Sequence, residues 1–382
     1  MLNSDATINA SSRHTRAFSP RVLDLTRVLA GPLCTMMLGD IGARVIKVER
    51  PGTGDDTRGW GPPFDEGGRS AYFLSVNRNK LSVAADLDRR EDVALLASLA
   101  GDADVVVENF RPGTLERRGL EPDTLLVANP SLIWCTITGF GRFSTRAGYD
   151  FIVQAEQGWM AITGEPAGAP MKIGVALADV IAGKDAAIAI LAALAARGEH
   201  ALRPDDRRLV ISLAHSATAA LVNVAQNVLV SGAEAKRWGN AHPNLVPYQL
   251  FDAADRPFAI GVGTDAQWLA CATALELHQL AADPRLTTNA GRVEHRAYLI
   301  DAMQSTLRHR NAREWLDKLD ASGVPAGLVR SVGEAVKDVP ASPLTGVAPL
   351  PPGTVRYPPP ALDEHGAAIR RYGWSAFDRL RD

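Results

Sequence analysis

The first half of the chain alternates short apolar segments with amphipathic ones, and this alternation constrains the fold more than any other feature. Apolar segments typical of buried strands lie at residues 21–25, 43–48, 81–87, 104–107 and 132–137. Helical spacing of apolar residues is present at residues 31–41, 90–100 and 122–128. Strands joined through helices run parallel and need helices on both faces of their sheet. The sequence therefore predicts an α/β protein with a large Rossmann-like parallel-sheet domain.

The second half of the chain predicts a separate, small α+β domain. Residues 209–230 look like a strand followed by a long helix, and residues 248–262 look like a hairpin. Helical patterns follow, with a short strand at residues 326–329 and one polar helix at the end of a proline-rich tail. A hairpin followed by helices suits an α+β domain, and 382 residues are many for one core. We expect a disordered tail at 1–20, a large domain at 21–200 and 331–382, a linker at 201–221 and a small domain at 222–330.

Composition and charge narrow the class of protein. A chain with 46% hydrophobic and 22% charged residues is typical of soluble globular proteins. The net charge of −2 argues against a nucleic-acid partner, and no uninterrupted apolar run is long enough to cross a membrane. Three widely spaced cysteines indicate neither a disulfide framework nor a zinc site. We therefore expect a cytoplasmic protein with no metal, no nucleic-acid partner and no membrane partner.

The first strand–helix turn bears on which ligand such a sheet binds. Residues 26–32 contain only Gly31, whereas the dinucleotide fingerprint needs three glycines. Glu49 follows the second strand, where a ribose-binding acid would lie, but without the glycines we interpret it as coincidental. The loop at residues 51–78 is rich in Gly, Pro and Asp, and loops of this length are usually functional or mobile. The sheet is thus predicted to bind a ligand other than a dinucleotide.

Asp179 stands out within residues 171–198, between an apolar approach and a strongly helix-forming run. The simplest interpretation is a helix N-cap, because an Asp ahead of a helix satisfies free backbone N–H groups. A helix start also keeps a carboxylate ionised and oriented, and an ionised carboxylate can attack an activated carbonyl. The local residues leave both interpretations open.

Several phrases carry a resemblance to a known family. They include VLDLTRVLAGP (22–32), LGDIGARVIKVER (38–50), DVVVENFRPGTLERRG (104–119), ADVIAG (178–183) and GNAHPNLVPYQLF (239–251). In this order the chain resembles the family III CoA-transferases, a superfamily that includes formyl-CoA transferase, carnitine CoA-transferase and α-methylacyl-CoA racemase. The likeness covers nearly the whole chain after Arg21. The last phrase is similar to the dicarboxylate branch, which uses succinyl-CoA.

The resemblance implies that Asp179 is the catalytic aspartate of a CoA-transferase. Its carboxylate would attack a donor acyl-CoA, form a mixed anhydride and then an aspartyl-CoA thioester, and pass coenzyme A to an acceptor carboxylic acid. The implied ligand is coenzyme A, bound as acyl-CoA, and no metal takes part. The family fold is an interlocked homodimer whose chains each contain a large and a small domain.

The resemblance also assigns residues to the coenzyme and to the substrate. Those implied to bind coenzyme A are Arg27, Val28, Leu29, Ala30, Arg50, Asn109, Phe110, Arg117 and Arg146. Arginine forks match phosphate oxygens, although a solvated surface charge is the common fate of any single arginine. Tyr149 and the segment with Gly239, Asn240 and His242 are implied to close over the substrate. An ordinary turn explains that segment equally well.

Departures from the family pattern bear on the reaction. Tyr149 stands where the racemase branch has its catalytic histidine, and a tyrosine with a pKa of about 10 is a poor shuttle for an α-proton. Leu29 replaces a glutamine of formyl-CoA transferase, which argues against oxalate as a substrate. Asp88 replaces an adenine-side lysine, for which Arg89 or Arg90 could compensate. The loop at residues 139–148 lacks the usual Gly-Pro. We predict CoA transfer, with a racemase or epimerase using Asp150 or Asp179, and an inactive CoA-binding protein, as alternatives.

Overall fold

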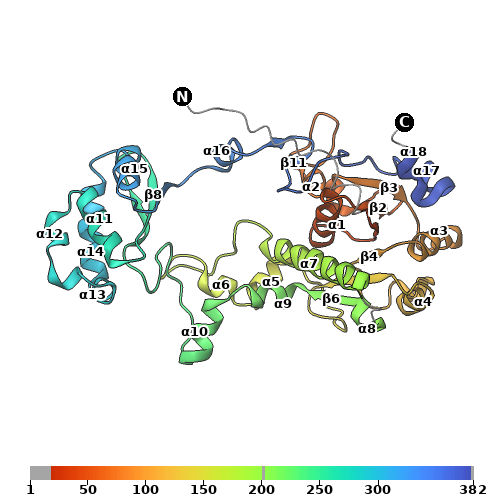
Figure 1. Cartoon of the computed structure of the whole chain (residues 1–382), viewed down its shortest axis with the longest axis horizontal. Helices are drawn as coiled ribbons and strands as arrows, with labels where there is room; N and C mark the ends of the chain where they lie inside the picture. Colours follow the sequence, from red (N-terminus) through yellow and green to blue (C-terminus); the bar gives the residue numbers. More distant parts are fainter. Residues whose placement is uncertain (1–18, 200–202, 380–382) are drawn as a thin grey trace. The chain divides into compact units, whose positions relative to one another are not determined.

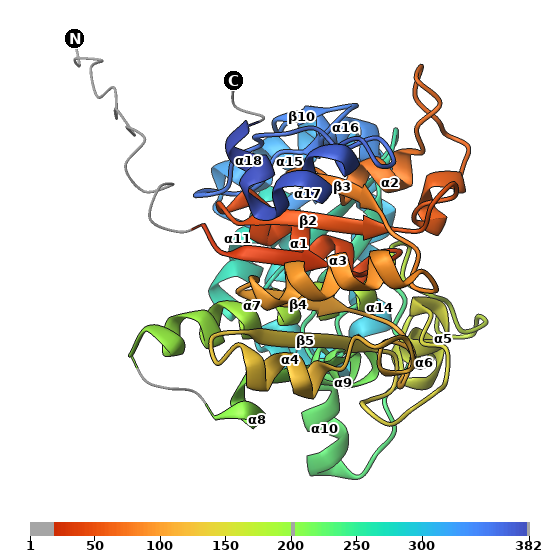
Figure 2. The same cartoon turned by 90° about the vertical axis from the view of Figure 1, so that its right-hand side faces the viewer.

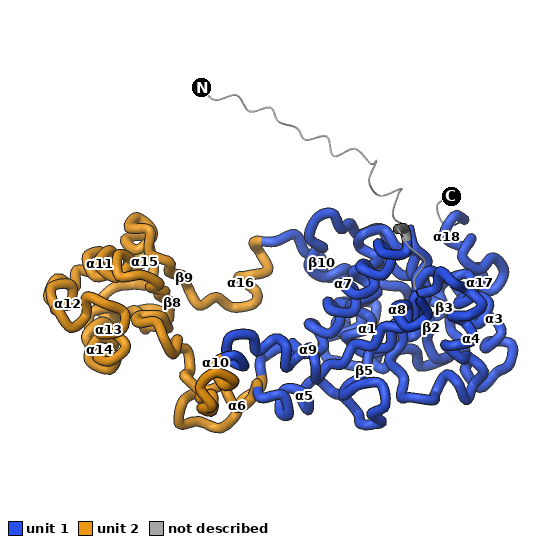
Figure 3. Tube along the Cα trace, turned by 60° about the horizontal axis from the view of Figure 1, so that its bottom comes forward, with its two compact units in different colours: residues 1–158, 173–226, 339–382 blue, residues 159–172, 227–338 orange. Residues whose placement is uncertain are grey.

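The computed structural model describes residues 19–199 and 203–379, so the predicted tail at 1–20 lies almost wholly outside the described residues. The chain divides into two compact units (Figure 3). Within the described residues, the first unit contains 19–158, 173–226 and 339–379, and the second contains 159–172 and 227–338.

A six-stranded parallel sheet forms the centre of the first unit, in the order β3-β2-β1-β4-β5-β6. Its strands are β1 (Arg21–Asp24), β2 (Arg44–Glu49), β3 (Lys80–Ala84), β4 (Val105–Glu108), β5 (Ile133–Thr138) and β6 (Arg208–Ser212). The predicted parallel sheet is thus confirmed. Strand β3 ends three residues before the predicted boundary at residue 87, because its register with β2 stops at Ala84.

Helices cover both faces of this sheet (Figures 1 and 2). On one face lie α1 (Ala30–Asp40) and α7 (Leu177–Glu199), and on the other lie α3 (Arg90–Gly101), α4 (Pro122–Ala128) and α17 (Gly366–Tyr372). The remaining elements of this unit are short: η1 (Asp56–Gly59), α2 (Ala71–Ser75), η2 (Glu116–Arg118), α5 (Asp150–Glu156), α8 (Pro204–Arg207), α9 (Leu213–Ala219), β10 (Ala341–Ser342), β11 (Gly346–Val347), η4 (Gly373–Ser375) and α18 (Ala376–Arg379).

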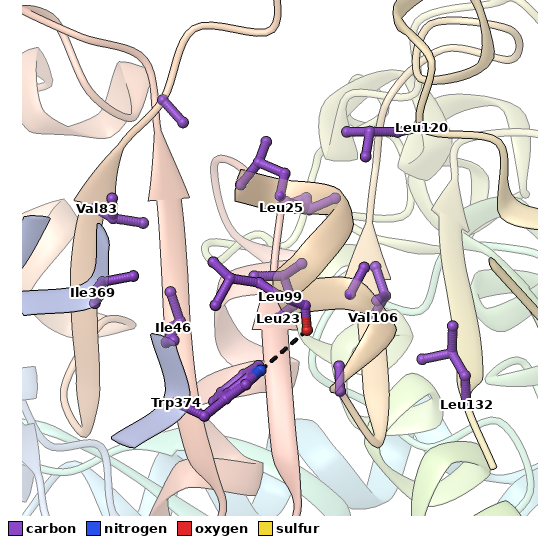
Figure 4. Packing of buried hydrophobic residues seen from close by; sticks show 14 of the residues in the cluster. Leu23, Leu25, Ile46, Val83, Leu99, Val106, Leu120, Leu132, Ile369 and Trp374 are labelled. Atoms are coloured by element: carbon purple, nitrogen blue, oxygen red, sulfur yellow. Dashed lines mark hydrogen bonds between the residues drawn. The ribbon is translucent and has the colours of Figure 1, made fainter. Parts of the chain in front are cut away.

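The C-terminal segment belongs to the core of the first unit. Ile369, Trp374 and Phe377 are buried among leucines and valines of the sheet and of α3. The indole N–H of Trp374 donates to the backbone oxygen of Leu99 at 3.0 Å (Figure 4). The sequence predicted only a polar helix at the end of the tail. In the structure this segment also contributes side chains to the core. Its apolar residues pack on the sheet while its charged residues face solvent.

The predicted linker at 201–221 is wrong in its described part, residues 203–221. These residues form α8, β6 and α9, because β6 extends the sheet by pairing with β5. The long helix predicted to reach residue 230 breaks at Val222, whose φ is 43°, and resumes as α10 (Asn223–Ser231). Among the described residues no single helix is long and apolar enough to cross a membrane, although α9 and α10 taken together meet that test.

The second unit has its own sheet and core. Strands β7 (Tyr248–Asp252), β8 (Pro257–Gly261) and β9 (Ala326–Leu328) form an antiparallel sheet, as the hairpin pattern predicts. Buried aromatic residues Phe251, Phe258, Trp268 and Trp315 belong to one core that joins the sheet to several helices. The helices of this unit are α6 (Trp159–Ile162), α11 (Asp265–Ala274), α12 (His278–Ala281), η3 (Pro284–Leu286), α13 (Asn289–Glu294), α14 (Arg296–Leu307), α15 (Ala312–Ala321) and α16 (Val332–Val336).

Candidate active site

A cavity of about 260 Å³ lies at the carboxyl ends of β1, β4 and β5 in the first unit. In the strand order of this sheet, β1 and β4 are neighbours where the direction of winding reverses. Ligands of open parallel sheets bind at this position. The cavity brings together most of the predicted site residues: Arg27, Val28, Leu29, Ala30, Asn109, Phe110, Arg146, Tyr149 and Asp179.

Asp179 lies in the first turn of α7, two residues after the helix begins at Leu177. It is therefore not the N-cap that the local sequence suggested. That role falls to Asp150, whose Oδ1 accepts the backbone N–H groups of Ala178 at 2.8 Å and Asp179 at 3.4 Å. Because Asp150 satisfies the helix start, the Asp179 carboxylate is left to face the cavity.

The environment of Asp179 favours its protonated form more than water does. Burial is the largest cause and the neighbouring Asp150 charge the second, and together they raise the pKa of Asp179 to about 7. The backbone N–H of Ala30 donates to the carboxylate and opposes this rise. Asp179 is thus a carboxylate that changes charge near neutral pH.

Close approach of α7 to the start of α1 makes that Ala30 contact possible. A Cβ at Gly183, one helical turn after Asp179, would lie only 2.6 Å from the backbone oxygen of Ala30. A Cβ at Gly31 would lie 2.3 Å from the Thr26 side chain. Both distances are shorter than real Cβ contacts, so each position requires glycine for packing.

Side chains from distant segments hold the turn between β1 and α1. The Asn109 side chain accepts the Arg27 N–H at 3.0 Å and donates to the Arg27 oxygen at 2.9 Å. The Lys47 ammonium donates to the Thr26 oxygen, and the Asp55 carboxylate accepts the Val28 N–H. Lys47 and Asp55 were not predicted. The sequence signal that could have revealed them is a lysine inside an apolar strand, since a buried ammonium needs a partner.

A second cavity of about 190 Å³ adjoins the first and shares Arg27 and Phe110 with it. Arg50, a predicted coenzyme residue, lines this second cavity. Asp88 also lines it, and its charge partner is Arg118 at 3.0 Å. Arg89 instead pairs with Glu91. Arg118 was not predicted, because the two residues lie far apart in the sequence.

The predicted arginines differ in where their side chains lie. Arg146 pairs with Glu156 and stacks over Phe140, at 4.1 Å from the ring centre. Arg27 pairs with Asp56 at 3.5 Å and lies over the Phe110 ring. Arg117 is exposed and lines neither cavity. The positive charge of the first cavity therefore comes from Arg27, Arg111 and Arg146.

The predicted substrate segment is divided between the two units. Tyr149 is exposed and lines the first cavity. Gly239 and Asn240 belong to the second unit, where the Gly239 N–H donates to the Gly164 oxygen at 3.2 Å. The His242 N–H donates to the Tyr248 oxygen at 2.9 Å. Action of this segment at Asp179 stays a prediction. Among residues 19–199 and 203–379, no group of three His, Cys, Asp or Glu side chains could hold a metal ion.

Comparison with known proteins identifies the family of the chain. The family model described as CoA-transferase family III matches residues 20–366. Succinate–glutarate CoA-transferase of Agrobacterium fabrum is 43% identical over 327 residues, 83% of this chain and 81% of that protein. Succinyl-CoA:glutarate CoA-transferase of Homo sapiens is 39% identical over 373 residues, 91% of this chain and 84% of that protein.

A solved structure extends the likeness to the fold. A CAIB/BAIF family protein from Brucella suis is 40% identical, with a TM-score of 0.81 over 92% of this chain and 97% of that chain. The predicted resemblance, including its dicarboxylate branch, is confirmed by these relatives. The chain belongs to CoA-transferase family III.

Proposed function

We propose that this CoA-transferase moves coenzyme A from succinyl-CoA to a dicarboxylic acid such as glutarate, through a covalent intermediate on Asp179. The observation that carries the proposal is the position of Asp179. Its carboxylate lies in the first cavity, accepts the Ala30 N–H and has a pKa of about 7. The names of the relatives support the choice of donor and acceptor.

The chemistry follows from a carboxylate and a thioester. Asp179 attacks the donor carbonyl, the C–S bond breaks, and a mixed anhydride and CoA thiolate result. The thiolate attacks the aspartyl carbonyl, releases the donor acid and leaves an aspartyl-CoA thioester. The acceptor carboxylate then attacks this thioester and expels the thiolate, which attacks the acceptor carbonyl and frees Asp179. Each bond broken is matched by one formed, and no net proton is exchanged.

The start of α1 supplies the means to stabilise the charge that develops in these steps. The first N–H groups of a helix have no partner within the helix. The Ala30 N–H already donates to an Asp179 oxygen. When that carboxyl carbon is attacked, the same oxygen gains negative charge, and a donor already in place stabilises it without reorganisation.

The charges lining the cavity suit substrates with more than one negative group. Three arginines, Arg27, Arg111 and Arg146, line the cavity together with the carboxylates of Asp56 and Asp179. The guanidinium groups can bind phosphates of coenzyme A and the distal carboxylate of a diacid. Leu29 and Ala30 line the same cavity and offer an apolar contact to methylene groups. A short diacid presents this combination.

The racemase alternative needs Asp150 or Asp179 as its base, and the geometry does not favour Asp150 in that role. One of its oxygens accepts N–H groups of α7, and the other accepts the Gln154 amide N–H at 2.7 Å. A carboxylate so engaged is a weak proton acceptor. Tyr149 does not provide the imidazole that the racemase branch has at this position.

The test is product formation with matched variants. Incubation with succinyl-CoA and glutarate should give glutaryl-CoA and succinate, read by mass spectrometry. Asp179→Asn should lower the rate by about 1,000-fold or more, as loss of a covalent nucleophile does, and should still bind free coenzyme A. Leu350→Ala, an exposed position outside the cavity, serves as control. Wild-type turnover in Asp179→Asn would contradict the mechanism.

A further inference from the structure

The turn that joins β1 to α1 contains an unusual backbone conformation. Val28 has a φ of 72°, in the left-handed region. A β-branched residue there is a genuine outlier, because its side chain crowds the backbone. Such a conformation persists only when surrounding groups fix it. What fixes Val28 therefore bears on how the site works.

Asp55 is the group that holds Val28 directly. Both oxygens of its carboxylate lie 3.3 Å from the Val28 nitrogen and accept its N–H. The neighbouring residues of the turn have other restraints, from Asn109 on Arg27 and from Lys47 on Thr26. Among the described residues, only Asp55 accepts a hydrogen bond from the Val28 N–H.

Asp55 is in turn firmly anchored. The Lys47 ammonium lies 3.0 Å from its Oδ2, and both side chains are fully buried. Oδ1 accepts the Thr57 N–H at 3.0 Å, and the Asp55 N–H donates to Glu49 at 3.0 Å. Replacing a buried ion pair by apolar residues is often neutral or stabilising, so fold stability alone is a weak reason for this pair. The ion pair fixes the Asp55 carboxylate next to Val28 in the turn between β1 and α1.

The restraint on Val28 passes to the reacting carboxylate. Val28 is followed by Leu29 and then by Ala30, the first residue of α1, whose N–H donates to Asp179. The φ of Val28 sets the direction in which the chain enters that helix. If Val28 relaxed to a negative φ, the Ala30 N–H would turn away from Asp179.

Building on the proposed function, we propose that Asp55, anchored by Lys47, is a positioning residue for CoA transfer. It keeps Val28 in the left-handed conformation and thereby aims the Ala30 N–H at Asp179. In this proposal, the loop at residues 51–78 places the Asp55 carboxylate next to the Val28 N–H.

Asp55→Asn tests the proposal, because it keeps the shape but replaces one acceptor oxygen with an NH₂ group. We expect kcat to fall about 10- to 100-fold, the loss typical of a small misplacement, with a smaller change in KM for succinyl-CoA. A second readout needs no turnover: carbodiimide labels protonated carboxyls, and mass spectrometry reports Asp179 labelling against pH. The labelling midpoint should rise above the wild-type value, because the Ala30 donor is lost.

Asp40→Asn is the matched control. Asp40 pairs with Arg78 at 2.7 Å, both side chains are 5% exposed, and neither lines the Asp179 cavity. This variant should keep the Asp179 labelling midpoint and the wild-type kcat. A folded Asp55→Asn protein with both values unchanged would overturn the proposal. Altered midpoints in a protein whose wild type transfers no coenzyme A would instead refute the proposed function alone.

Val28→Gly provides a further check, because glycine adopts a positive φ at no steric cost. Asp55→Asn should lower Tm less in the Val28→Gly background than in the wild-type background. If Asp55→Asn alone does not fold, the double variant should. Equal losses of Tm in both backgrounds, or a double variant that also fails to fold, would contradict the restraint on Val28.

Discussion

Asp179 combines two demands on one side chain. It must be ionised to attack a thioester, yet burial and Asp150 raise its pKa to about 7. A carboxylate in this environment is less solvated and more basic than one in water, and a more basic group is a better nucleophile when ionised. The Ala30 N–H limits the rise. Asp150, which caps α7, and the Ala30 N–H at the start of α1 thus shift the pKa of Asp179 in opposite directions.

This balance predicts a specific pH dependence. Only the ionised form attacks, so kcat should fall as pH drops below about 7, the pKa of Asp179. Asp150→Asn removes a repulsive charge while keeping one oxygen for the helix cap, so the acidic limb should move to lower pH. Glu156→Gln, on the same helix α5, should leave the limb in place. If the acidic limb of the kcat profile stays at the same pH or moves to higher pH in Asp150→Asn, its assignment to Asp179 is contradicted.

The structure brings Asp179 and the turn at residues 27–30 to one cavity, and both were found in the sequence because they lie within continuous phrases. Their roles in the reaction stay predictions. The sequence did not single out Lys47, Asp55 and Arg118. Their partners come from other strands and loops, and pairing depends on register and loop path, which no local pattern encodes. The lysine in β2 indicated only that some buried carboxylate must face it.

At the scale of elements, the site depends on how closely α7 approaches α1. Gly183 permits this approach, and it is the last residue of the ADVIAG phrase that contains Asp179. Apolar spacing predicted α1 to within one residue of each end, whereas the sequence placed Asp179 ahead of α7, which begins at Leu177. The break in the helix after residue 219 was not predictable, because it occurs at Val222, a residue with no turn preference.

Gly183→Ala tests the helix approach. The added methyl would meet the backbone oxygen of Ala30 at 2.6 Å, so the helices must separate. We expect kcat to fall about 100-fold, since small displacements of catalytic groups cost this much, together with a lower Tm. Gly101→Ala, where a Cβ meets nothing within 4 Å, should leave kcat unchanged. Equal activity in both variants would show that the approach is unimportant.

At the scale of the whole molecule, residues distant in sequence complete the first unit. The C-terminal segment covers the sheet beside β3, with Ile369 and Trp374 in the core. Charged residues are interspersed among its apolar ones, so the sequence predicted only a polar helix. The parallel sheet itself was predictable because strands and helices alternate regularly. The order of its strands follows from crossovers that local patterns do not reveal.

Trp374→Ala should destabilise the first unit by about 3–5 kcal/mol, as expected for removal of a buried Trp. The Trp374 side chain is 5% exposed and donates to Leu99. Leu350→Ala, at a residue that is 86% exposed, should change stability little. Urea unfolding monitored by circular dichroism measures both. Similar midpoints for the two variants would contradict the place of the C-terminal segment in the core.

The most direct test of the account is to trap the activated Asp179. Wild-type protein is mixed with succinyl-CoA and hydroxylamine without an acceptor acid, digested, and examined by peptide mass spectrometry. The account predicts a hydroxamate on Asp179, absent without succinyl-CoA and absent from Asp150 in the same sample. Glutaryl-CoA formation by an enzyme that never yields this adduct, or an adduct on a different carboxylate, would contradict the covalent role of Asp179.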